Sequence, residues 1–119
     1  MESKLFDSEL RIMDILWEKG DTSAKRIAEI LKEQVGWSKT TTYTVIKKCL
    51  DKGIIVRTEP NFICSSLITK EQAQEFEATE LINKMYGGAA DQLVASILRR
   101  KQLLPEEIKR LKQLVNNLE

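Results

Sequence analysis

Apolar residues recur at helical spacing in three successive stretches of the first half of the chain. We expect a helix capped by Ser8 that runs to about Lys19, and a second helix that follows Asp21-Thr22-Ser23. A third helix should begin after Ser38 and end at Gly53. The turn between the second and third helices is short and contains glycine, which is helix-turn-helix spacing. The residues expected to face inward from the first two helices are Leu10, Met13, Leu16, Trp17, Ile27, Ile30 and Leu31.

The third predicted helix has two faces that suit different surroundings. Its apolar stripe contains Thr42, Val45, Ile46, Cys49 and Leu50. Its other side carries Thr40, Thr41, Thr44, Lys47 and Lys48. No carboxylate occurs on this helix before Asp51. Lysines can meet phosphates, while threonine hydroxyls and methyls can meet base edges in a major groove. We therefore expect a DNA-recognition helix over about 38–52.

Two short runs rich in β-branched and aromatic residues follow, at Ile54–Thr58 and Phe62–Leu67. Glu59-Pro60-Asn61 between them supplies turn residues, since proline fixes φ and asparagine tolerates tight geometry. Three helices followed by a hairpin predict a winged helix-turn-helix domain over residues 1–68. The fold class is therefore mainly α with a small β hairpin.

From Thr69 onward the pattern predicts three further helices, over about 69–86, 90–101 and 105–118. Their apolar residues exceed what one small winged domain can cover. A partner surface is the simplest solution, and a symmetric dimer is its commonest form. We expect residues 69–119 to form a helical dimerisation domain. Its expected interface residues are Phe76, Ile82, Met85, Tyr86, Leu93, Val94, Ile97, Leu111, Leu114 and Leu118.

The distribution of charge agrees with a local DNA-binding surface. The formal net charge of the 119 residues is only +1, but between Gly36 and Arg57 five basic residues stand against one acid, Asp51. The positive potential is therefore confined to the third helix and the strand after it.

Several function classes find no support. No apolar run approaches the roughly 18 residues of a membrane span, and the first residues lack a signal-peptide core, so we expect a cytoplasmic protein. The chain contains no histidine, no CxxC pair and no glycine-rich phosphate loop. We expect no metal, no cofactor and no enzymatic activity, because nucleophilic catalysis needs a positioned base. Cys49 and Cys64 lie in apolar contexts and are interpreted as small core residues.

Several segments of the chain carry a resemblance to a known family. They are SELRIMDILWEKG, SAKRIAEIL, WSKTTTYTVIKKCLDKGII, LITKEQA, INKMYGGAADQLVASIL and PEEIKRLKQLVNNLE. Together they resemble the penicillinase and methicillin-resistance repressors of the BlaI/MecI type, over nearly the whole chain. The resemblance implies a homodimeric winged-helix repressor that covers a dyad-symmetric operator of β-lactam resistance genes.

The resemblance also implies roles for particular residues. Ser38, Thr41, Thr44 and Lys48 match positions that contact DNA in the family, and Arg57 matches the basic residue that enters the wing. With the polar helix face, the expected DNA-binding set is Ser38, Lys39, Thr40, Thr41, Thr44, Lys47, Lys48 and Arg57. Family members are typically released from DNA when a membrane-bound sensor metalloprotease responds to a β-lactam and the repressor is cleaved. Alignment with LVASIL places the corresponding bond near Ser96-Ile97.

The chain departs from the family pattern at three places. Lys48 stands where arginine is usual, so a fork-shaped contact becomes a point charge. The wing is short and carries Glu59, and Ser96-Ile97 replaces the asparagine-phenylalanine of the family's best-known cleavage site. The copper-responsive relatives add CxC motifs near the C-terminus, where this sequence has no cysteine.

Two alternatives remain open from the sequence. The chain could be a winged-helix regulator controlled by a metal or small ligand instead of proteolysis. It could also be a protein-interaction module that kept the fold but lost DNA binding, for which the acidic wing is the best support.

Overall fold

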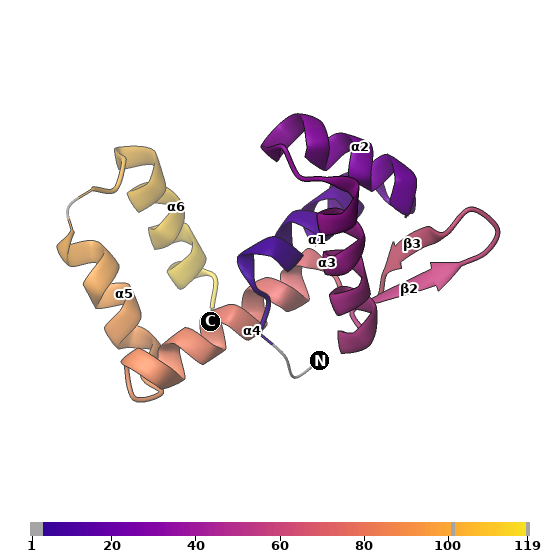
Figure 1. The fold of residues 1–119 in the computed structure, drawn as a ribbon. Coiled ribbons are helices and arrows are strands. Elements are labelled where there is room, and N and C mark those ends of the chain that lie inside the picture. Colours follow the sequence, from indigo (N-terminus) through magenta and orange to yellow (C-terminus); the bar gives the residue numbers. More distant parts are fainter. Residues whose placement is uncertain (1–3, 101, 119) are drawn as a thin grey trace. The chain divides into compact units, whose positions relative to one another are not determined.

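The computed structural model describes residues 4–100 and 102–118 of the chain (Figure 1). Its elements run in the order α1 (Asp7–Lys19), β1 (Thr22–Ser23), α2 (Ala24–Val35), α3 (Lys39–Lys52), β2 (Ile55–Thr58), β3 (Ile63–Ser66), α4 (Lys70–Met85), α5 (Ala90–Arg99) and α6 (Pro105–Asn116). The mainly helical fold class with a small sheet, predicted from the sequence, is confirmed. The chain divides into two compact units, Met1–Glu77 and Ala78–Glu119.

Helix α1 begins two positions away from the expected boundary. Its N-cap residue is Phe6, and the predicted cap at Ser8 is wrong. The backbone N–H of Phe6 donates to Oε1 of Glu9 at 2.9 Å. A carboxylate in the first turn therefore satisfies the backbone donor of the N-cap residue. Leu10 was also expected inward but is 39% exposed. It lies about 100° around the helix from Glu9, while Ile12 and Met13 occupy the buried side.

The other two helix starts follow the sequence. Ser23 Oγ accepts the backbone N–H of Arg26 at the start of α2, and Ser38 Oγ accepts the N–H of Thr41 at the start of α3, both at 3.1 Å. Gly36 and Gly53 end these helices in the left-handed conformation. These hydroxyl caps use donors that each first turn would otherwise leave unpaired.

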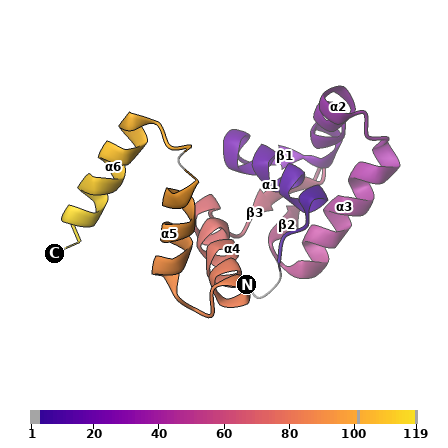
Figure 2. The same cartoon turned by 90° about the vertical axis from the view of Figure 1, so that its left-hand side faces the viewer.

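The wing is part of a three-stranded antiparallel sheet in the order β1-β3-β2 (Figure 2). The predicted hairpin strands are present, and Arg57 of β2 lies opposite Cys64 of β3. The two-residue strand β1 was not predicted. It pairs Thr22 with Cys64 and Ser23 with Ile63, so it depends on a contact between distant parts of the chain. The pairing ties the wing to the loop between α1 and α2.

A single hydrophobic core holds the winged unit together. It includes Ile12, Met13, Ile27, Leu31, Val45, Ile46, Cys49, Ile54 and Cys64. Thr42, Val45, Ile46 and Cys49 are buried from α3, while Leu50 is only half-buried at the edge of the stripe. The predicted apolar face of α3 therefore packs inward, as its periodicity required.

A buried ion pair joins the start of α1 to the end of α3. Lys52 Nζ lies 2.6 Å from Glu9 Oε1 and donates to the backbone oxygen of Lys4 at 2.6 Å. The Glu9 side chain is 1% exposed and that of Lys52 18% exposed. The ammonium also lies 4.5 Å from the centroid of the Phe6 ring. Lys52 thus has a structural position in the folded chain.

Helix α4 crosses the division between the two units. Its start is a capping box, because the N–H of Gln72 donates to Thr69 Oγ1 at 3.0 Å and the N–H of Thr69 donates to Gln72 Oε1 at 2.9 Å. Ala73 is buried in the first unit's core, and Trp17 Nε1 donates to the backbone oxygen of Ile68 at 3.0 Å. The first turns of α4 therefore pack with the winged domain, and the contact boundary falls after Glu77.

The second unit lacks a core of its own among the described residues. No residue of α5 or α6 is buried. Large apolar side chains that are exposed there include Leu81, Met85, Val94, Leu98, Leu104, Ile108, Leu114, Val115 and Leu118. None of the described helices has both the length and the apolar character needed to cross a membrane.

The two buried thiols both have a pKa above the usual value for cysteine. Cys49 and Cys64 are both 0% exposed. Burial raises the pKa of Cys49 to about 12, with a further contribution from the charge of Glu9. Burial likewise raises the pKa of Cys64 to about 11, although the nearby Arg57 charge acts in the opposite direction. Both groups therefore remain neutral thiols, which fits their interpretation as core residues.

We predict that Lys52→Met strongly destabilises the fold. The substitution keeps the side chain's length but leaves the Glu9 carboxylate buried without its cation, which should cost roughly 3 kcal/mol in the free energy of unfolding. Urea unfolding followed by circular dichroism measures the loss. Lys47→Met is the matched control, because its partner Asp51 is exposed and should contribute less than about 1 kcal/mol. Equal losses in the two variants would contradict the structural role of Lys52.

We also predict that stability falls in alkaline solution. The thiols have a higher pKa in the folded chain than in the unfolded chain, so the unfolded chain loses their protons first. Their contribution is complete below about pH 9 and declines above it, by up to about 1.4 kcal/mol per pH unit for each thiol. Urea unfolding between about pH 8 and 10 measures this slope. A Cys49→Ala/Cys64→Ala variant should lose the part of the slope that begins near pH 9, and a slope unchanged in that variant would refute the assignment.

Candidate nucleic-acid interface

The surface of α3 opposite the core carries the residues that the sequence singled out for DNA. All eight of them are exposed: Ser38, Lys39, Thr40, Thr41, Thr44, Lys47, Lys48 and Arg57. Seven lie along α3 and its N-cap, and Arg57 lies on strand β2. Figure 2 shows α3 at the margin of the winged unit with one long side uncovered by other elements. This side is open to a ligand as large as a duplex.

The hydroxyl groups at the start of α3 have distinct hydrogen-bonding states. Ser38 Oγ caps the helix and donates to Thr41 Oγ1 at 3.0 Å, so its position is set by the fold. The hydrogen of the Thr41 hydroxyl stays available to an acceptor outside the chain. Thr44 Oγ1 donates to the backbone oxygen of Thr40 at 2.9 Å. Thr44 can therefore meet a base through its methyl group or as a hydrogen-bond acceptor.

The lysines of this surface differ in how their charge is balanced. Lys47 Nζ lies 3.2 Å from Asp51 Oδ2, one helical turn away, in an exposed pair. Lys39 Nζ lies 5.7 Å from the centroid of the Tyr43 ring. Among the residues that the structure describes, neither Lys39 nor Lys48 forms an ion pair. These two cations are the ones most available to phosphates.

Aromatic contacts join α3 to the wing. The rings of Tyr43 and Phe62 meet edge to face, with centroids 5.8 Å apart. The guanidinium carbon of Arg57 lies 3.7 Å from the Phe62 centroid, and Arg57 Nε donates to Glu59 Oε2. Phe62 and its link to Tyr43 were not anticipated, because no local pattern joins residues on separate elements.

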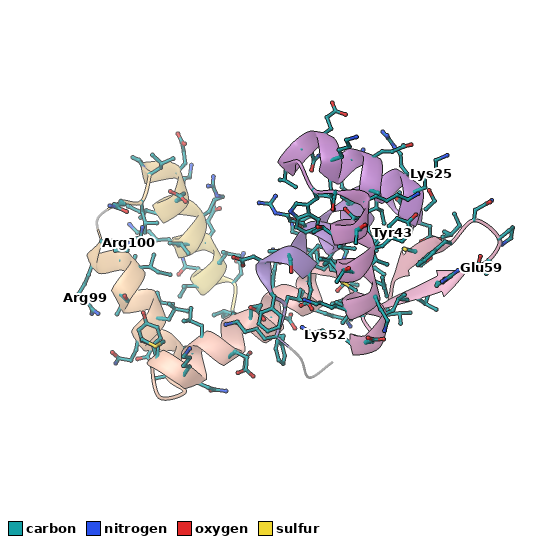
Figure 3. All side chains as sticks on the ribbon, viewed as in Figure 1. Lys25, Tyr43, Lys52, Glu59, Arg99 and Arg100 are labelled. Carbon is teal, nitrogen blue, oxygen red and sulfur yellow. The ribbon has the colours of Figure 1, made fainter. Side chains whose placement is uncertain are left out.

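Lys25 is a basic residue on α2 that the sequence did not assign to DNA binding. Lys25 is exposed in the first turn of α2. Figure 3 shows Lys25 on the same side of α3 as Tyr43 and the wing residue Glu59, whereas Lys52 lies near the end of α3. Sequence reasoning missed Lys25, since a lone lysine on an amphipathic helix is normally a solvated side chain. Its placement follows only from how α2 packs against α3.

A shallow recess of about 420 Å³ marks the middle of the surface. It is lined by Lys39, Thr40, Tyr43, Thr44 and Lys47. Its walls combine the side chains of two lysines, two threonines and one tyrosine. The recess is shallow and open, so it does not enclose a small ligand as a binding pocket would.

The residues expected at the dimer interface and cleavage site lie on α4, α5 and α6 or directly after α4 and α6. Met85, Val94, Leu114 and Leu118 are exposed large apolar side chains. The half-buried members are Phe76, Ile82, Tyr86, Leu93, Ile97 and Leu111. Ser96 and Ile97 are both half-buried inside α5. Arg99 and Arg100 end this helix in the second unit, where Arg100 Nη2 donates to Gln102 Oε1 at 2.7 Å (Figure 3).

Known proteins of one kind match the chain along its length. The methicillin resistance regulatory protein MecI of Staphylococcus aureus strain N315 is 31% identical over 121 residues, which cover 98% of this chain and 98% of that protein. The penicillinase repressor of Staphylococcus aureus is 29% identical, with 93% of this chain and 90% of that protein covered. The penicillinase repressor of Bacillus licheniformis is 24% identical, with 94% and 89% covered.

A family profile gives the same result. The profile described as penicillinase repressor matches residues 5–117, which include the winged unit, the exposed face of α3 and the three C-terminal helices. The resemblance inferred from the sequence segments is thereby confirmed, and the chain belongs to the penicillinase repressor family.

Proposed function

We propose that this protein is a homodimeric transcriptional repressor that binds a dyad-symmetric operator of β-lactam resistance genes. The observation that carries the proposal is the division of α3 into a buried apolar stripe and an exposed face of threonines and lysines. Two findings support the assignment of the regulated genes to β-lactam resistance. They are membership of a repressor family and the names of the methicillin-resistance and penicillinase relatives. Family membership also argues against an enzyme.

In this proposal α3 enters the major groove. Thr41 would donate a hydrogen bond through its free hydroxyl hydrogen, and Thr44 would present its methyl group or oxygen to a base. Lys39 and Lys48 would contact phosphates as point charges, and Lys47 would join them once its exposed pair with Asp51 opens. Lys25 at the start of α2 would extend the phosphate contacts along the same side.

The dimer would supply the core that the second unit lacks. In the single chain no residue of α5 or α6 is buried, so these two helices gain little stability from packing. A second copy would cover the exposed apolar side chains of α4, α5 and α6, with Met85, Val94 and Leu114 as central contacts. Two recognition helices would then lie at a fixed separation, which is what a dyad-symmetric operator demands.

Release from DNA would follow cleavage at Ser96-Ile97 by a membrane-bound sensor metalloprotease. The bond lies in α5 three residues before the helix ends at Arg99. Because a protease binds an extended segment, α5 would have to unwind locally before cleavage, and its half-buried residues present little internal resistance. Cutting there would separate α6 from the rest of the interface and weaken the dimer.

Footprinting on the DNA upstream of the protein's own gene tests the whole proposal. A protected dyad-symmetric site that weakens steeply with salt is the expected result, since lysines release counterions from phosphates. Protection on one side of the dyad only would argue against a dimer. No protection at low salt would overturn DNA binding itself.

We predict that Thr44→Ala lowers affinity for the operator by about 1–3 kcal/mol and leaves affinity for random duplex nearly unchanged. The alanine removes both groups through which Thr44 can contact a base. Fluorescence anisotropy with the two duplexes measures the difference. Lys47→Ala is the comparison, because losing a phosphate contact should weaken both duplexes alike. If Thr44→Ala changes neither affinity, the exposed face of α3 is wrongly assigned.

We predict that Leu114→Glu weakens the dimer by about 1,000-fold, because the substitution occurs once in each subunit and each leucine no longer buried costs about 2 kcal/mol. Sedimentation equilibrium over a range of concentrations measures the dissociation constant. Leu67→Glu is the matched control: Leu67 is 56% exposed, comparable to Leu114 at 64%, but lies in the winged unit. A monomeric wild-type chain, or equal effects of both variants, would rule out the proposed interface.

A further inference from the structure

The wing arginine is held by contacts within the wing. Its guanidinium carbon, Cζ, lies over the Phe62 ring, 3.7 Å from the ring centroid. On the same strand-and-turn segment, Arg57 Nε donates to Glu59 Oε2. The second oxygen of Glu59 accepts the backbone N–H of Phe62 at 3.4 Å. Glu59 is therefore attached to both sides of the turn, and Arg57 lies between the carboxylate and the ring.

This arrangement removes the wing's net charge. A free arginine at this position would add one phosphate contact and release one counterion from DNA. Paired with Glu59, the guanidinium already has an anionic partner, and the carboxylate would repel any phosphate that approached it. Both side chains are about half exposed, at 48% and 57%, so the pair lies where a duplex could reach it.

The wing pair is more constrained than the exposed pair on α3. Lys47 and Asp51 are joined at 3.2 Å by two flexible side chains that are 75% and 66% exposed. Arg57 has a ring beneath it, and that ring packs against Tyr43 of the recognition helix at 5.8 Å between centroids. Moving Arg57 onto a phosphate would therefore break a hydrogen bond to Glu59 and a stacking contact together.

The sequence placed Arg57 in the DNA-binding set, but its contacts within the wing point to another role. We infer that Glu59 is a specificity-determining residue of the wing: it holds Arg57 away from phosphates and so lowers the sequence-independent part of DNA affinity. The inference rests on the proposed DNA-binding function. With the wing restrained, a larger share of the binding free energy comes from the face of α3, where Thr41 and Thr44 can distinguish bases. Removing the negative charge of Glu59 would release Arg57 and raise affinity for every sequence.

A double-mutant cycle on the full-length chain tests this role. Glu59→Gln, Arg57→Gln and the double variant are compared with wild type on a random duplex and on the upstream DNA, between about 50 and 200 mM salt. Glu59→Gln should bind the random duplex roughly 5- to 10-fold more tightly, and its log–log salt slope should steepen by about 0.9. The ratio of specific to random affinity should fall. The double variant should return to the wild-type slope, and Arg57→Gln alone should change it little.

Glu18→Gln is the matched control. It removes one exposed carboxylate that neighbours a lysine, at 3.8 Å from Lys19, but on α1 rather than on the wing. It should leave the salt slope unchanged.

The inference is overturned if Glu59→Gln behaves like this control. It is overturned as well if the gain in affinity persists without Arg57, because the carboxylate would then act by simple repulsion of phosphates. It is also overturned if Arg57→Gln flattens the slope in the wild-type background, because Arg57 would then already contact phosphate. A wild-type chain that binds no DNA at any salt concentration would instead refute the proposed function, and the inference with it.

Discussion

The burial of one face of α3 is the constraint on which the rest of the winged unit depends. Thr42, Val45, Ile46 and Cys49 pack into a core shared with α1, α2 and the sheet. Once that stripe is buried, helical geometry leaves the other threonines, Thr40, Thr41 and Thr44, and the lysines beside them no orientation except outward. The candidate DNA surface is thus a consequence of core packing. No further interaction is needed to keep its polar side chains exposed.

Polar contacts then fix the ends of this helix. Ser38 closes the N-terminus, and Lys52 anchors the C-terminus to the Glu9 carboxylate and the backbone of Lys4. A buried pair of this kind contributes little net stability compared with apolar packing, but it penalises any arrangement in which one charge is left alone. The Tyr43–Phe62 contact adds a third point, between the middle of α3 and the wing. The candidate DNA surface is accordingly supported at both ends of α3 and by the wing.

The two units differ in whether their apolar side chains are buried within the chain. The winged unit satisfies its apolar side chains internally, apart from isolated residues such as Val56 and Leu67. The second unit leaves large apolar side chains exposed on all its helices. Large exposed apolar side chains in such number normally mark an interaction surface. In the proposed function, a DNA-binding unit with its own core is joined to a segment that only a second copy covers. Operator binding would then depend on assembly, so that damage to α5 would end repression without altering α3.

The sequence by itself determined the helices of the winged domain, the hairpin, the fold class and the exposed face of α3, because periodicity, hydroxyl caps and turn residues are local signals. It also determined the family. Tertiary structure alone decided which charges are available. Lys52 and Arg57 belonged to the same basic segment as Lys48, yet Lys52 is held by Glu9 and Arg57 by Glu59. It also decided the start of α1 and the pairing of β1. These features depend on side-chain geometry or on contacts between residues far apart in the chain, which no local pattern of residue types specifies.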